Sequence, residues 1–139
     1  MYLVIGANGF LGSYILKNIL EHTQDEIIAV ARNIEAVIYN PRIKWRSCDI
    51  SDEKAVDALC EEINDLEKKV IFLAAYHNPD LVEKNPKFAW NINVTSLSYF
   101  VNRLLNVKCL FYPSTDSVYG DSVNEYCFKE EDQLNPVNT

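Results

Sequence analysis

The sequence predicts an α/β fold, a doubly wound parallel sheet of about five strands in the order 3-2-1-4-5 with helices on both faces. Short apolar runs alternate along the chain with segments whose apolar residues recur at helical spacing. The first apolar run leads directly into a turn with three regularly spaced glycines, and an amphipathic stretch follows. Strands that alternate with helices in this way form parallel sheets through right-handed crossovers.

The predicted strands are short apolar runs of the kind that a sheet covered on both faces requires. They span residues 1–5, 27–31, 43–48, 70–74 and 107–112. From Gly120 onward the chain is polar and loop-like, and no sixth strand is predicted. The strand that would follow the fifth is therefore not expected in this chain.

Three helices are predicted between these strands. The first carries an apolar stripe from Leu11 to Leu20. The second begins at Ser51, which precedes two acidic residues that suit a first helical turn. The third is a long helix over about residues 87–105, preceded by a loop or short helix that Pro79 and Pro86 delimit.

Composition excludes several classes of partner. The 139 residues suit one domain, spanning residues 1–139, and the net charge of −7 argues against nucleic acid. No apolar run reaches membrane-spanning length and the first residues lack a signal peptide's basic leader, so a cytoplasmic protein without a membrane partner is expected. The cysteines show no metal-ligand spacing, so reduced, packed thiols and no metal are expected at Cys48, Cys60, Cys109 and Cys127.

The glycine turn predicts a dinucleotide-binding site of the Rossmann type, with a purely structural turn as the alternative. Gly6 permits the tight turn, Gly9 lets a phosphate approach the backbone, and Gly12 lets the helix pack closely on the strand. The first N–H groups of the helix would face the pyrophosphate with the positive end of the helix dipole. Cofactor contacts are expected from Gly6, Asn8, Gly9, Phe10, Leu11 and Gly12.

The residues after the second strand favour NADP over NAD. An acidic side chain there would bond the adenosine ribose hydroxyls, but this chain has Arg32 and Asn33. A guanidinium suits a 2′-phosphate through bidentate contact. The alternative is that Arg32 is a solvated loop charge.

Two further strand ends carry candidate cofactor residues. After the third strand, Asp49 can accept a hydrogen bond from the adenine amino group while Ile50 packs beside the ring; Asp49 is equally plausible as an N-terminal helix carboxylate. After the fourth strand, small side chains suit a close approach of the cofactor to the backbone, and tight sheet packing explains them equally well. These residues are Leu73, Ala74 and Ala75.

Together with a later segment, these motifs make the chain resemble the extended short-chain dehydrogenase/reductase family of nucleotide-sugar epimerases, dehydratases and reductases. The later segment is Ser114-Thr115-Asp116 ahead of Val118-Tyr119-Gly120. Asn93-Val94-Thr95-Ser96 is similar to the family's Asn-Val-x-Gly, with serine in place of glycine. Within the family the run around Tyr76-His77 is most similar to dTDP-4-dehydrorhamnose reductases, whereas Ser117 stands where the dehydratases carry glutamate.

The resemblance implies a cofactor contact at Asn93 and a catalytic hydroxyl at Thr115, which would hold the oxygen of the reacting sugar carbon. It also implies a Tyr-x-x-x-Lys pair for proton transfer, which the sequence lacks, because Tyr126 is followed four residues later by Glu130. The family spacing would place that tyrosine directly after Thr139. By the same resemblance, the family's substrate-binding domain is not expected in this chain.

These observations favour the NADP-binding domain of a nucleotide-sugar oxidoreductase, a 4-keto-sugar reductase or epimerase, that is inactive as this chain alone. The expected partners are a nicotinamide dinucleotide and, in a full-length protein, a nucleotide-sugar. The alternative is a non-catalytic dinucleotide-sensing or scaffold domain. An uncovered sheet edge after the fifth strand predicts a homodimer or a larger assembly.

Overall fold

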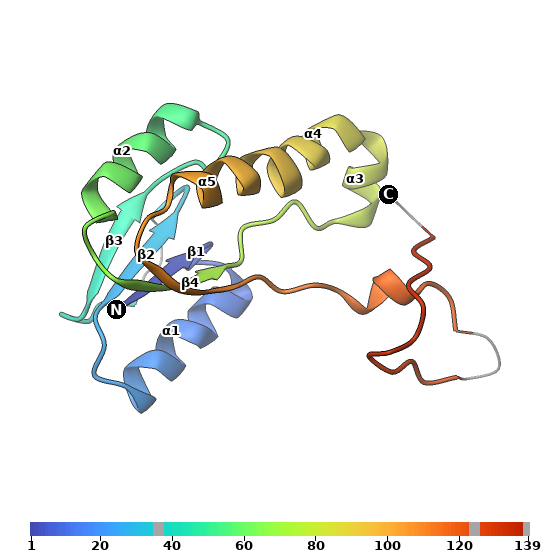
Figure 1. Ribbon diagram of the computed structural model, residues 1–139, viewed down its shortest axis with the longest axis horizontal. Helices are drawn as coiled ribbons and strands as arrows, with labels where there is room; N and C mark the ends of the chain where they lie inside the picture. The colour runs from blue at the N-terminus through green and yellow to red at the C-terminus, as the bar shows by residue number, and fades with distance from the viewer. Residues whose placement is uncertain (35–37, 123–125, 138–139) are drawn as a thin grey trace.

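The computed structural model describes residues 1–34, 38–122 and 126–137, so Asn138 and Thr139 lie outside the described residues. Its five-stranded sheet has the order β3-β2-β1-β4-β5, and all of the strand pairings are parallel (Figure 1). Fold class and strand order are therefore confirmed. The strands are β1 (Tyr2–Ile5), β2 (Ile27–Ala31), β3 (Ile43–Ser47), β4 (Lys68–Phe72) and β5 (Val107–Phe111).

The helices cover the two faces of the sheet unequally. Helix α1 (Phe10–His22) lies on one face, and α2 (Glu53–Ile63) and α5 (Leu97–Arg103) lie on the other (Figure 1). None of the helices in the described part of the chain is long and apolar enough to cross a membrane. The remaining helical elements are α3 (Pro79–Lys84), α4 (Pro86–Trp90), the π-helical turn η1 (Asn91–Ser96) and the 3₁₀ helix η2 (Asp116–Tyr119).

The core consists of two apolar layers that share the sheet. Leu3 and Ile5 of β1 point into the layer under α2 and α5, which also contains Phe72 and Phe100 with their rings in edge-to-face contact. Val4 points into the layer under α1. The central strand is thus covered on both faces, as its unbroken apolar sequence requires.

The fourth strand begins two residues earlier than hydropathy predicts, at Lys68 instead of Val70. The backbone N–H of Lys68 donates to Asn106 O at 3.0 Å, and that of Lys69 donates to Met1 O at 3.0 Å. The Lys68 side chain is fully buried, and its Nζ donates to Leu105 O at 2.7 Å. Burial lowers the pKa of this ammonium group. A hydropathy pattern excludes a lysine from a buried strand, because the pattern does not show that a backbone carbonyl will accept a hydrogen bond from the ammonium group.

Two helical predictions need correction. Helix α2 is capped by Asp52 and not by Ser51, because the Asp52 carboxylate accepts from the N–H groups of Lys54 and Ala55 at 3.0 and 3.4 Å. The predicted long helix over 87–105 is one helical segment over 86–103, but η1 interrupts its α-helical geometry. Apolar spacing does not reveal a π turn, because a helical segment has the same apolar pattern with or without one.

The cysteine prediction holds for two residues and is wrong for the other two. Cys48 and Cys60, the latter on α2, are buried in the core layer between α2 and the sheet, and burial raises the pKa of the Cys48 thiol to about 11. Cys109 and Cys127 are exposed instead of packed. Cys109 belongs to β5, whose five residues are all exposed because no described element covers this strand.

The contact of Gly12 with the preceding loop yields a stability prediction. A Cβ on Gly12 would overlap the Gly6 carbonyl and lie 2.7 Å from Ala7 O, whereas one on Gly9 would meet only Gly6 O at 3.3 Å. We expect Gly12→Ala to lower the free energy of unfolding by about 1–3 kcal/mol, although alanine favours the helix by about 1 kcal/mol. Urea unfolding would measure this change, with Gly9→Ala as the matched control. Equal losses in the two variants would contradict the assigned packing role.

Candidate cofactor-binding site

The glycine turn lies where the carboxyl ends of three strands meet. Gly6, directly after β1, has a φ of +81°, and a Cβ on it would lie 2.9 Å from Ala74 N at the end of β4. The N–H groups of Gly6 and Ala7 both donate to Val30 O of β2, at 2.9 and 3.0 Å. The turn is therefore fixed between β2 and β4, and only glycine satisfies both the positive φ and the close approach.

The N-terminus of α1 behind this turn is open. Gly9 is the N-cap, and among the described residues no side chain supplies a capping hydrogen bond to this helix end. The first N–H groups of a helix have no acceptor within it, so the amides of Phe10, Leu11 and Gly12 remain available to a ligand, whereas Ser13 N already donates to Gly9 O at 2.9 Å. Phe10 and Leu11 are 83% and 47% exposed. This arrangement favours an anion, because the unpaired amides and the helix dipole act together.

Arg32 and Asn33 follow β2 beside the glycine turn. Both side chains are exposed, but both backbone carbonyls accept hydrogen bonds from side chains. Asn8 Nδ2 donates to Asn33 O at 2.7 Å, and Ser47 Oγ donates to Arg32 O at 2.9 Å. The structure thus brings the predicted selector residues next to the predicted phosphate turn. Ser47 is not among the predicted site residues. The only signal for its contact with Arg32 is its position at the end of β3, the strand next to β2.

Asp49 lies near Arg32 and is ionised at neutral pH. Its Oδ1 accepts from Ser51 Oγ at 2.7 Å and from Ser51 N at 2.9 Å. These two bonds, and more weakly the Arg32 charge, hold the pKa of Asp49 below its usual range. Asp49 is half-buried, whereas Ile50 is buried and belongs to the core layer under α2. Asp49 therefore remains a hydrogen-bond acceptor at this edge of the sheet.

Asn93 fixes the segment that follows β4. Its Oδ1 accepts from Tyr76 N at 2.7 Å, and its Nδ2 donates to Tyr76 O at 2.9 Å. We call this pair of hydrogen bonds the Asn93 clamp. Because Asn93 lies in η1, the clamp and the π turn occur at the same place in the helical segment. Leu73 and Ala74 are half-buried and Ala75 is exposed, between the contact at Gly6 and the clamp at Tyr76. The predicted cofactor residues after β4 are thus fixed at one end by the close approach of Gly6 and at the other end by the Asn93 clamp.

Thr115 lies apart from the glycine turn. Figure 1 shows the chain running away from the sheet after β5 towards η2, which Thr115 caps by accepting from Ser117 N at 3.2 Å. Its hydroxyl also donates to Asp116 Oδ1 at 3.3 Å. The side chain is exposed. The structure thus places the Thr115 hydroxyl at an exposed capping position at the start of η2, outside the glycine turn.

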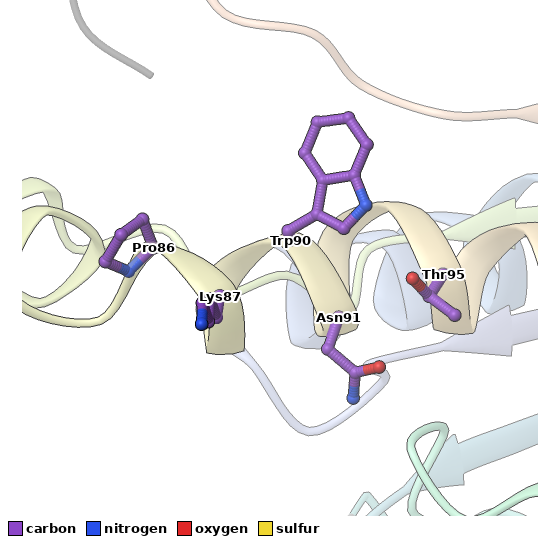
Figure 2. A pocket seen from close by; sticks show the side chains of 5 residues that line it. All are labelled: Pro86, Lys87, Trp90, Asn91 and Thr95. Atoms are coloured by element: carbon purple, nitrogen blue, oxygen red, sulfur yellow. The ribbon is translucent and has the colours of Figure 1, made fainter.

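A shallow surface hollow lies elsewhere, on the helical segment before α5. Figure 2 shows that one stretch of helix supplies all of the side chains that line it, with the Trp90 ring standing off the helix surface. None of the predicted site residues lines this hollow, which extends from the first residues of α4 to η1. The lining residues are Pro86, Lys87, Trp90, Asn91 and Thr95.

A parallel sheet in this order, with a glycine turn between its first strand and first helix, defines a Rossmann-type domain of the extended short-chain dehydrogenase/reductase class. The chain belongs to the family described as the RmlD substrate binding domain, whose model matches residues 1–139. The family resemblance of the motifs is confirmed.

Relatives and solved structures of this class are similar over nearly the whole chain. The dTDP-glucose 4,6-dehydratase of Haemophilus influenzae is 28% identical over 96% of this chain and 45% of its own length. The ADP-L-glycero-D-manno-heptose-6-epimerase of Brachyspira hyodysenteriae is 30% identical over 99% of this chain and 44% of its own. The UDP-glucose 4-epimerase of Thermus thermophilus, solved in complex with NAD, shares the fold with a TM-score of 0.85 at 19% identity, over 99% of this chain and 45% of its own. The chain thus spans less than half the length of these proteins.

The Asn93 clamp yields a second stability prediction. Asn93→Ala would leave the N–H and the C=O of Tyr76 without their side-chain partner, so we expect a loss of about 1–3 kcal/mol in the free energy of unfolding. Urea unfolding would measure the loss. Asn91→Ala, at an exposed position in the same π turn, is the control and should change stability little. An equal effect of the two substitutions would contradict the clamp.

Proposed function

We propose that residues 1–139 form the NADP-binding domain of a nucleotide-sugar oxidoreductase, a 4-keto-sugar reductase or epimerase. The observation that carries this proposal is the uncapped N-terminus of α1, which opens at the glycine turn between the ends of β1 and β4. Backbone amides and a helix dipole aimed at one place are suited to a pyrophosphate. The named relatives, a nucleotide-sugar dehydratase and an epimerase, support the substrate class.

The residues around the turn have distinct binding roles. Gly9 keeps the turn free of a side chain, since a Cβ there would point away from all protein atoms except Gly6 O. Arg32 supplies the positive charge for a 2′-phosphate, and Asp49 supplies an acceptor for the adenine amino group. The bound nicotinamide would supply hydride transfer, so the protein contributes binding, orientation and proton movement.

The same chain by itself is proposed to be inactive. Thr115 offers a hydroxyl for the sugar oxygen, but the sequence holds no Tyr-x-x-x-Lys pair. Tyr126 does not replace it, because its OH donates to Asp132 Oδ1 at 3.3 Å and Asp132 raises the pKa of Tyr126. A tyrosine that transfers its proton at neutral pH needs a lowered pKa. Loss of a general acid costs about 10²–10⁴-fold in rate.

A cofactor titration tests the proposal. We expect NADPH to bind more tightly than NADH, and Arg32→Asp to reverse this order because the carboxylate repels a 2′-phosphate and accepts from ribose hydroxyls. Binding would be followed by the fluorescence of the reduced nicotinamide. Gly9→Ala is the control that should weaken both cofactors, because its methyl group occupies the phosphate cradle. Absence of binding by the unmodified chain would refute dinucleotide binding, and equal affinities would refute the NADP assignment.

We also propose that the chain associates with itself through β5. This strand is at the edge of the sheet, and its exposed side chains include Val107, Leu110 and Phe111 at 39%, 42% and 54%. The single cation of β5, Lys108, is paired with Glu67 at 2.8 Å. An apolar edge strand with free backbone groups pairs readily with a second strand.

Light scattering under reducing conditions tests the association. We expect a mass of at least a dimer at micromolar concentration, and a shift towards the monomer for Cys109→Lys, because a charge in the centre of an edge strand opposes pairing. Asn18→Lys, at an exposed position on α1, carries the same charge change and should leave the mass unaltered. A monomeric mass for the unmodified chain would contradict the proposal.

A further inference from the structure

Hydrogen bonds fix the backbone at the end of β2 and in the exposed residues that follow it. Four successive carbonyls accept hydrogen bonds, from the β1 side or from the β3 side. Val30 O accepts from Gly6 N and Ala7 N, and Ala31 O accepts from Cys48 N at 3.0 Å. These bonds are the end of the regular backbone network.

Two side chains continue this network beyond the strand. Ser47 Oγ, on the last residue of β3, donates to Arg32 O at 2.9 Å. Asn8 Nδ2, in the glycine turn, donates to Asn33 O at 2.7 Å. The two carbonyls are thus fixed from opposite sides, although the side chains of Arg32 and Asn33 are both exposed.

The fixed backbone matters because an arginine side chain is flexible. An exposed arginine on a mobile loop loses conformational entropy when it binds a phosphate, and that loss weakens the contact. Anchoring its backbone removes part of the loss before binding. The anchored Arg32 lies at the same sheet edge as Asp49, because the two residues follow the paired ends of the parallel strands β2 and β3.

We propose that Ser47 and Asn8 are positioning residues for cofactor selectivity, which hold the Arg32–Asn33 backbone so that the Arg32 guanidinium is presented to the 2′-phosphate of NADP. This inference rests on the proposed function, because Ser47 affects cofactor selectivity only if Arg32 binds the 2′-phosphate. Ser47 acts through Arg32, so its removal affects NADPH and spares NADH, whose ribose carries no 2′-phosphate.

A pair of nearly isosteric substitutions isolates the Ser47 hydroxyl. Threonine and valine have the same shape and both suit a strand end, but only threonine can donate to Arg32 O. We expect Ser47→Val to weaken NADPH binding about 3- to 10-fold and NADH binding less than 2-fold, as for the loss of one hydrogen bond. Ser47→Thr should keep the NADPH-to-NADH affinity ratio of the unmodified chain. Asn8→Ala should lower the same ratio.

A double-substitution cycle tests whether Ser47 acts through Arg32. In an Arg32→Ala background, Ser47→Val should no longer change the affinity ratio. Two results would overturn the inference while leaving NADP binding intact: an unchanged ratio in Ser47→Val, or an equal weakening of both cofactors. Equal affinities of the unmodified chain for NADPH and NADH would instead refute the proposed selectivity, and the inference with it.

Discussion

The architecture of the candidate site depends on one backbone contact, the approach of Gly6 to the end of β4. A Cβ on Gly6 would lie 2.9 Å from Ala74 N, so any other residue would force β1 and β4 apart at their carboxyl ends. The positive φ at Gly6 turns the chain out of the sheet at this same point. The direction of α1, and with it the placement of its open N-terminus, follows from this turn. Gly12 completes the arrangement by letting the helix lie directly on the turn.

Around this contact, side chains with polar groups extend the backbone network of the sheet. Asn93 bonds both the N–H and the C=O of Tyr76, as a neighbouring strand would. Ser47 and Asn8 do the same, each with one bond, for the segment after β2. The backbone groups that they bond, in Arg32, Asn33 and Tyr76, lie beyond the ends of β2 and β4. Side-chain hydrogen bonds therefore help to order the loops that carry the candidate site.

The sequence predicted the elements well because the signal for each is local. The run 27–31 is entirely apolar and corresponds residue for residue to β2. The limits of β4 were missed, since two lysines at its start are hydrogen-bonded into the ladder and one of them is buried against Leu105 O. The π turn at Asn91–Ser96 was missed for a related reason, because a helical stripe has the same apolar pattern with or without it. In the first case the decisive partner, Leu105 O, is 37 residues away in the sequence.

The sequence by itself determined the fold class, the strand order and the glycine turn, because hydrophobic periodicity and three glycines act over a few neighbouring residues. Only the tertiary structure decided that Arg32 and Asp49 share one edge of the sheet, that Asn93 bonds Tyr76, and that the segment carrying Thr115 runs away from the sheet after β5. These relations join residues from different strands, and a distance between strands is set by packing that no local pattern encodes.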